Sequence, residues 1–312
     1  MSVRRAFIIL LCISISILAV LEGISRVILS NVYNRKFDSS LIEENKYGTS
    51  SGLKSNATGL VWGKPFHTDE MGGRRTIKKG KGKLKMLVIG DSVTEGVGVD
   101  DTATFIDLAT KGWDDWDIRN ISLIGWSSSD YRNVVDHLIV KDSGIKILCL
   151  FYCLNDIYGK STSTELPPIA NKGFISSINA LLQDRCAIYK LIKLFVYQDS
   201  QSYYQYDQAF YNDSLRVNAV MDDLVHIKDV CDSSKVVFTM YILPYRSQLI
   251  DRNNDLPQRV LAAKLRENHI MYVDLLKELP NKKDYKDWYL FGDEIHLSAM
   301  GHRAVAEAIF HK

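Results

Sequence analysis

Five short strand-like runs, four of them largely apolar, alternate with helix-like segments and constrain the fold of this chain more than any other feature. The runs predict strands at residues 85–90, 117–123, 146–153, 235–243 and 270–275. Helices are predicted at residues 104–111, 129–140, 256–268 and 298–310, with longer ones within 172–232. Strands that alternate with helices indicate an α/β fold with a five-stranded parallel sheet covered on both faces. Ligands of such sheets bind beyond the carboxyl ends of the strands, so we expect the chemistry there.

The length and composition fit one sizeable core. The chain has 312 residues, 46% of them hydrophobic, and single α/β domains of roughly 200–250 residues are common. We expect a membrane anchor at residues 1–29, a linker and lead-in at 30–82, and a catalytic domain at 83–312 with a helical insertion at about 160–232. The formal net charge of +2 gives no reason to expect nucleic acid as a partner. The oligomeric state stays open.

The N-terminus has the pattern of a membrane helix. Arg4 and Arg5 precede a run without charge from Ala6 to Leu21. The run lies between the length of a signal-peptide core, roughly 7–15 residues, and that of a full span, roughly 20. No small-residue cleavage site follows, so we expect an uncleaved single-pass anchor, although cleavage stays open. Arginines before the span are typical of the cytoplasmic side, which predicts an extracytoplasmic catalytic domain.

The cysteines do not form a disulfide framework. There are five, an odd and sparse set. Cys149 and Cys153 stand in an apolar run, where we expect them to pack as small hydrophobic side chains. A pairing of Cys186 with Cys231 stays open. No Cys/His cluster indicates a metal site.

A serine and a histidine stand at the positions where the sheet predicts chemistry. Ser92 follows the first strand, where a helix start supplies free backbone N–H groups. Asp293 and His296 lie just before the last helix, and a spacing of three brings their side chains to one side. The aspartate can then orient the imidazole as a base for the weak serine nucleophile. Taken alone, each pattern is equally typical of a helix cap or a surface turn.

Two further strand ends carry groups suited to an oxyanion. Asn155 follows the third strand, and its side-chain amide can donate to a developing negative charge. Gly125 follows the second strand, where glycine lets the backbone approach a substrate closely. The alternative for both residues is an ordinary turn.

In this order along the chain, the four groups resemble the blocks of the SGNH (GDSL-type) hydrolase family. Gly90–Ser92, Asn120–Gly125, Asn155–Asp156 and Asp293–His296 match them in turn. The resemblance covers about Leu84 to Phe310, apart from the insertion. Cys153 departs from the family's third block, which usually has glycine there. In the lead-in, residues 66–75 also resemble a segment of membrane-anchored members.

The resemblance implies a fold and a mechanism. The fold is a flavodoxin-like three-layer α/β/α sandwich. The implied triad is Ser92 as nucleophile, His296 as base and Asp293 as orienting group. The implied oxyanion hole consists of the Ser92 and Gly125 backbone N–H groups and the Asn155 side chain. No metal or organic cofactor is implied.

The sequence leaves several functions open. The first is hydrolysis of ester-linked acyl groups, most simply acetyl, on a cell-surface or exported carbohydrate or on a small ester. Transfer of the acyl group to a glycan, a lipid esterase and a non-catalytic glycan-binding scaffold are the alternatives. A flavodoxin-like nucleotide binder lacks its glycine-rich phosphate loop. Trp126, beside Gly125, is a candidate for substrate binding, whereas Tyr203, Tyr204 and Tyr206 favour packing between helices.

Overall fold

The structure of the chain is a computed structural model. It describes residues 3–33, 35–77, 84–110, 113, 115–159, 182, 185–196, 200–281 and 285–310. The chain divides into two compact units. One combines Met1–Arg35 with Leu166–Asp199, and the other combines Lys36–Glu165 with Ser200–Lys312. Residues 160–181 of the expected helical insertion lie outside the described residues.

The first unit is built around the apolar helix α1 (Val3–Tyr33). Its segment Val3–Ser30 has 28 residues, and the most apolar 18-residue window within it has a mean hydropathy of 2.7. At about 1.5 Å per residue this segment extends about 42 Å, more than the roughly 30 Å of a bilayer's hydrocarbon core. In the described part of the chain it is the one helix long and apolar enough to cross a membrane, and an N-terminal helix of this kind is an anchor or a signal sequence.

A polar contact joins α1 to α6 (Ala187–Val196) within the first unit. The Glu22 carboxylate accepts the backbone N–H groups of Ala187 and Ile188 at 2.9 and 3.0 Å. These N–H groups belong to the first turn of α6, where the helix itself offers no acceptor. Glu22 also pairs with Arg26, one turn along α1, at 2.8 Å.

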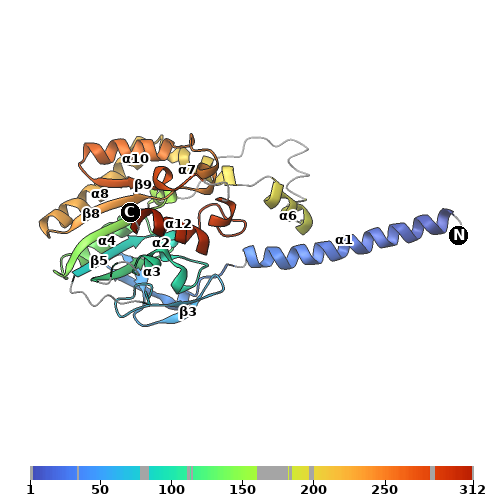
Figure 1. The fold of residues 1–312 in the computed structure, drawn as a ribbon, viewed down its shortest axis with the longest axis horizontal. Coiled ribbons are helices and arrows are strands. Elements are labelled where there is room, and N and C mark those ends of the chain that lie inside the picture. Colours follow the sequence, from blue (N-terminus) through green and yellow to red (C-terminus); the bar gives the residue numbers. More distant parts are fainter. Residues whose placement is uncertain are drawn as a thin grey trace. The chain divides into compact units, whose positions relative to one another are not determined.

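The second unit contains the predicted sheet, which is confirmed (Figure 1). Its order is β6-β5-β7-β8-β9, with all neighbours parallel. The strands are β5 (Leu84–Gly90), β6 (Trp116–Ser122), β7 (Ile145–Tyr152), β8 (Val237–Ile242) and β9 (Met271–Asp274). Apart from one lysine near the start of each, the central strands β5 and β7 have no charged residue, because helices cover both faces.

The helices form two layers because the chain changes direction across the sheet after β6. Right-handed crossovers then place α3 on one face and α4, α8 and α10 on the other, and α12, the last helix, returns to the face of α3. Accordingly α12 packs against α3, whereas α8 packs against α4 and α10. The helices of these layers are α3 (Phe105–Ala109), α4 (Ser128–Leu138), α8 (Ser214–Ser233), α10 (Leu256–Glu267) and α12 (Ala299–Phe310). The three-layer α/β/α arrangement is therefore confirmed.

Shorter helices complete the second unit. They are α2 (Ser92–Glu95), α7 (Ser200–Phe210), α9 (Arg246–Ile250) and α11 (Leu275–Glu278), with single 3-10 turns at Ser39–Leu41, Asp101–Ala103, Leu154–Tyr158 and Tyr285–Trp288. In α7, Tyr204 is buried and donates its hydroxyl to the Asn254 carbonyl at 2.7 Å. Its burial agrees with the expected packing, whereas Tyr203 is 59% exposed, contrary to that expectation. All five cysteines are free thiols, and Cys149 and Cys153 are buried.

The segment expected to be a linker and lead-in contains two antiparallel hairpins. One joins β1 (Ile42–Tyr47) to β2 (Ser50–Leu53), and the other joins β3 (Thr58–Val61) to β4 (Lys64–His67). Both bury apolar side chains in the core of the α/β unit, among them Tyr47 and Phe66, which are 2% and 1% exposed. Residues 36–77 therefore belong to the same compact unit as the sheet.

Candidate active site

The proposed nucleophile, Ser92, follows the carboxyl end of β5 in the sequence. Gly90 ends the strand, and a Cβ there would lie 2.7 Å from the Phe151 carbonyl oxygen, so the close approach of β7 excludes a side chain. Asp91 caps α2 by accepting the Val93 N–H at 2.9 Å. Ser92 is thereby fixed as the first residue of α2, with 4% of its surface exposed.

Ser92, His296 and Asp293 form one continuous chain of polar contacts. Ser92 Oγ lies 2.9 Å from His296 Nε2, although 204 positions separate the two residues. On the other side of the imidazole, Nδ1 lies 3.0 Å from both Asp293 carboxylate oxygens. The Asp293 Oδ1 also accepts the backbone N–H groups of Ile295 and His296 at 2.8 and 2.9 Å. The geometry suits proton transfer from the hydroxyl to an oriented imidazole.

Asp293 is held as a carboxylate. Burial alone raises its pKa, but the hydrogen bonds and the charge of His296, together with the backbone N–H donors, outweigh burial and lower the pKa far below its usual range. A carboxylate that stays ionised orients the imidazole through Nδ1 and leaves Nε2 directed at Ser92.

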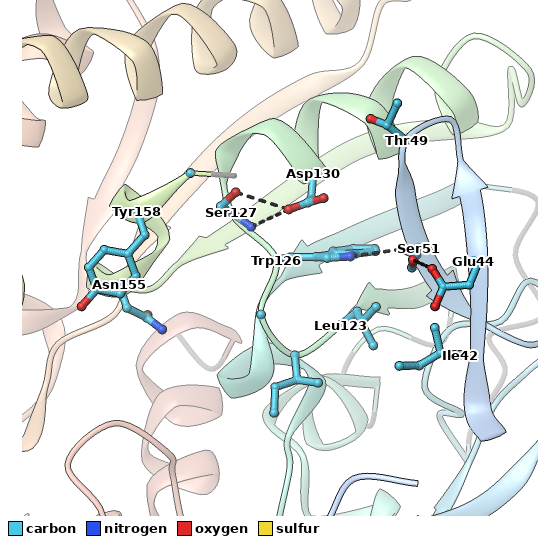
Figure 2. A pocket seen from close by; sticks show the side chains of 13 residues that line it. Ile42, Glu44, Thr49, Ser51, Leu123, Trp126, Ser127, Asp130, Asn155 and Tyr158 are labelled. Carbon is cyan, nitrogen blue, oxygen red and sulfur yellow. Dashed lines mark hydrogen bonds between the residues drawn. The ribbon is translucent and has the colours of Figure 1, made fainter. Parts of the chain in front are cut away.

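The two expected oxyanion residues line one pocket, which Figure 2 shows from close by. Gly125 has φ +81° and no atom within 4 Å of an added Cβ, so its backbone conformation, and not crowding, favours glycine. Asn155 belongs to the 3-10 turn Leu154–Tyr158 after β7. The pocket has a volume of about 430 Å³, and both residues line it. They thus come together at the sheet's carboxyl edge, as their strands predict.

The walls of this pocket come from distant parts of the sequence. Residues 123–127 form the middle of the pocket. Asn155 and Tyr158 lie at one end, and Gly159 also lines the pocket. The β1–β2 hairpin forms the other end through Ile42, Glu44, Thr49 and Ser51 (Figure 2). Carboxylate, hydroxyl and amide groups alternate there with aliphatic side chains. Sequence reasoning missed the hairpin wall because nothing in residues 42–53 resembles a functional motif.

Trp126 lies in the middle of the pocket, but most of its surface is covered. It is 5% exposed, and its indole N–H donates to the Ser51 carbonyl at 3.1 Å. Its ring also meets Tyr47 and Tyr131 edge to face. Trp126 thus attaches the β1–β2 hairpin to the core of the unit, and little of its surface is available to a ligand.

Glu95 supports the loop that carries Gly125. Its carboxyl is fully buried, and Oε2 accepts the Ile124 N–H at 2.7 Å, one residue before Gly125. Burial raises the pKa of Glu95 to about 8, in spite of that hydrogen bond and the nearby charge of Arg74. The sequence signal was weak, because an acid in a short helix is ordinarily exposed.

Arg74, from the lead-in, holds the turn after α2. It is 2% exposed, and its guanidinium donates to the backbone carbonyls of Glu95, at 2.8 Å, of Gly96, and of Val99, at 2.6 Å. Its Nε also contacts Asp101 Oδ1 at 3.1 Å. The resemblance of residues 66–75 to other lead-ins pointed to this region but assigned no role to Arg74.

A buried polar network stabilises the turn that carries Asn155. Asp156 accepts the Tyr131 hydroxyl at 2.7 Å and the Cys153 N–H at 2.8 Å. Burial, reinforced by the charge of Asp91, raises the pKa of Asp156 well above its usual range. Cys153 has φ −94°, which any residue adopts, so the family's glycine is not required at this position.

At the outer end of the same turn, Tyr158 is tied to α7. Tyr158 and Tyr245 both donate their hydroxyls to the Asp207 carboxyl. Burial raises the pKa of Asp207 to about 7, despite the hydrogen bond from Tyr245. This contact links the Asn155 turn to two further elements of the α/β unit.

Trp62, which sequence reasoning also missed, lies against the imidazole. The ring centroids of Trp62 and His296 are 4.5 Å apart at an interplanar angle of 69°. Trp62 belongs to the turn between β3 and β4, in the segment expected to be a linker and lead-in.

Among the described residues, no group of three or more His, Cys, Asp or Glu side chains is arranged to hold a metal ion.

The structural neighbours of the chain are lipolytic hydrolases of the GDSL type and acetylxylan esterases. The crystal structure of TesA is 13% identical, with a TM-score of 0.46 over 73% of this chain and 97% of that chain. A member of the lipolytic G-D-S-L family from Veillonella parvula is 17% identical, with a TM-score of 0.44 over 73% of this chain and 97% of that chain. A catalytic mutant of an acetylxylan esterase from Geobacillus stearothermophilus is 13% identical, with a TM-score of 0.43 over 76% of this chain and 95% of that chain.

No protein-family model and no curated protein matches the sequence. Because the identities and TM-scores of the structural neighbours are low, we draw the chemistry of the site from its own geometry.

Proposed function

We propose that this chain is a serine esterase or acyl-transfer enzyme with Ser92 as nucleophile, His296 as general base and Asp293 as orienting carboxylate. The observation that carries the proposal is the unbroken contact chain from Ser92 Oγ through the imidazole to Asp293. A serine hydroxyl needs such a base because it is a weak nucleophile at neutral pH.

The proposed reaction has two halves. Ser92 Oγ attacks the ester carbonyl carbon while His296 Nε2 accepts the hydroxyl proton. The backbone N–H groups of Ser92 and Gly125 and the Asn155 amide stabilise the negative oxygen. The imidazolium then gives its proton to the departing alcohol, leaving an acyl-serine. In the second half, water or a sugar hydroxyl attacks this ester, and the same histidine transfers the proton.

We further propose that the substrate carries a short acyl group, most simply acetyl, on a carbohydrate. The pocket beside Gly125 and Asn155 supports this, because its walls combine carboxylate, hydroxyl and amide groups with apolar ones. A long acyl chain requires a continuous apolar groove, since each buried CH₂ contributes only about 0.8 kcal/mol.

The location completes the proposal. Within α1, Arg4 and Arg5 precede the uncharged run from Ala6 to Leu21, and positive residues are typical of the cytoplasmic end of a span. We propose that α1 is a single-pass anchor and that the catalytic unit is extracytoplasmic. Cell-surface and exported polysaccharides are accessible from that side.

The test begins with a fluorophosphonate probe, which reacts with activated serines. The full-length protein should be labelled, and Ser92→Ala should not be. Ser233→Ala, at an exposed position on α8, is the matched control. Acetylated oligosaccharides and esters of increasing chain length then define the substrate, and the product, free acetate or an acetylated acceptor, separates hydrolysis from transfer. A preference for long-chain esters with no turnover of acetylated sugars would favour a lipid esterase instead.

A further inference from the structure

The turn between β3 and β4 has an unfavourable residue at its tip. Val61 pairs with Lys64, so Trp62 and Gly63 form a two-residue connection. Their φ angles are +52° and +76°. Two successive positive φ angles are the requirement of a type I′ turn, for which Asn-Gly is the preferred sequence. A bulky aromatic residue in the left-handed region is strained, and strain of this kind concentrates at functional sites.

The hairpin that carries Trp62 is firmly attached. The Trp62 N–H donates to the Lys36 carbonyl at 2.9 Å, and Phe37 forms an antiparallel bridge with Val61. On the opposite strand Phe66 is 1% exposed. The hairpin is therefore a rigid support, and the strained residue at its tip is the one that meets His296.

The contact places Trp62 on the alcohol side of the reacting ester. In the first half-reaction His296 Nε2 must protonate the departing alcohol, which brings the alcohol oxygen within about 3 Å of that nitrogen. The indole contacts the same imidazole ring and is partly exposed. Trp62 does not line the pocket beside Gly125 and Asn155, so its indole is a surface separate from that pocket.

The indole is partly packed against the apolar core, and it lies with the Leu290 side chain over Gly98. The hairpin that carries it also bears charge. Lys64, two residues further along, pairs with Asp100 at 3.6 Å, and both side chains are exposed. A partly exposed aromatic ring on a hairpin that also bears charged groups suits a ligand that has both an apolar face and hydroxyl groups, as a sugar ring does.

We propose that Trp62 is a specificity-determining residue that contacts the sugar ring bearing the acyl ester, on the alcohol side of the bond that breaks. The inference rests on the proposed esterase or transferase function and adds the subsite that selects the alcohol. It also accounts for a tryptophan at a turn position that favours asparagine.

The test uses Trp62→Asn in the full-length protein. Because Asn-Gly is the preferred type I′ sequence, this variant should have an unchanged or higher Tm. KM for an acetylated oligosaccharide should rise about tenfold, the loss expected for one stacking contact. Turnover of methyl acetate, whose alcohol is too small to cover an indole, should fall by a clearly smaller factor than turnover of the oligosaccharide. Trp62→Phe, which keeps an aromatic face, should recover most of the lost affinity.

Three results would overturn the assignment. An equal loss on both substrates would mean that Trp62 acts only by positioning His296. No loss on the oligosaccharide, or a wild-type enzyme that does not prefer it to methyl acetate, would remove the sugar contact. A lower Tm for Trp62→Asn would mean that the indole is kept for the stability of the fold and not for binding a sugar. Failure of the proposed function looks different, because wild type would then show neither probe labelling nor ester turnover, and the inference would fail with it.

Discussion

Replacement of Glu95 tests whether its buried carboxyl positions the loop that carries Gly125, a proposed oxyanion donor. In Glu95→Gln the amide oxygen can still accept the Ile124 N–H, whereas Glu95→Ala removes the acceptor and leaves that buried N–H unpaired. An unpaired buried donor costs about 1–3 kcal/mol of unfolding free energy. Gly125 is the next residue, so its displacement slows turnover by up to the roughly 100–1,000-fold that one lost oxyanion donor costs.

The titration of Glu95 gives the same replacement a pH signature. The pKa of its carboxyl is 4.5 when unperturbed and is raised to about 8 in the folded protein by burial. Between these values the folded state holds a proton that the unfolded state has released. The free energy of unfolding therefore falls as pH rises through this window, by at most about 1.4 kcal/mol per pH unit from this group.

Other buried groups titrate alongside Glu95, so the comparison with the glutamine variant isolates its contribution. Burial raises the pKa of Asp207 and of Glu294 to about 7, which adds the same downward trend in both proteins. Burial lowers the pKa of His302 to about 3, so protonation of this residue in the unfolded state reduces the free energy of unfolding only below its unperturbed pKa of 6.5. The informative range is pH 6.5 to 8.

The assay combines denaturant unfolding in that range with kcat on a small acetate ester. Wild type should lose stability with rising pH more steeply than Glu95→Gln. Glu95→Ala should be destabilised at every pH, and its remaining folded fraction should show a lower kcat with little change in KM. If the free energy of unfolding changes equally with pH in wild type and in Glu95→Gln, the argument that the buried Glu95 carboxyl titrates in this range is refuted. Full kcat in Glu95→Ala would refute the link to Gly125.

Three further predictions concern the proposed triad, the oxyanion hole and the membrane. Ser92→Ala should abolish turnover of an acetate ester while keeping the wild-type circular dichroism spectrum, because no other group replaces the nucleophile. Asn155→Ala should fold normally and slow kcat by roughly 100–1,000-fold; an unchanged rate would make Asn155 a turn residue only. Protease added to intact cells or spheroplasts should digest the catalytic unit, and protection until lysis would reverse the topology proposed from Arg4 and Arg5.

The sheet was predictable because its strands are buried on both faces. A strand such as Lys85–Gly90 then reads as an unbroken apolar run, and the residues just after such runs mark the carboxyl edge. This reasoning selected Ser92 and Asn155, and the structure brings them to that edge with Gly125 and His296. The confirmed five-stranded sheet therefore accounts for most of the candidate site.

The lead-in could not be predicted by the same reasoning. The strands at Thr58–Val61 and Lys64–His67 have four residues each, too few for a periodic pattern to stand out. Their turn lacks the asparagine that normally signals a hairpin, because Trp62 occupies its position. Glu95 was missed for a related reason, since only tertiary packing distinguishes a buried acid from an exposed one.

The two hairpins of residues 36–77 have a consequence for how relatives of this chain are grouped. A fragment that begins at Leu84 contains all four conserved-looking blocks, yet it lacks Trp62 and the Glu44 end of the pocket. On the proposed assignment, residues after Leu84 catalyse the reaction, and residues of the lead-in select the substrate. Two enzymes with identical blocks and different lead-ins would share a reaction and differ in substrate, so grouping by substrate requires the lead-in to be aligned as well.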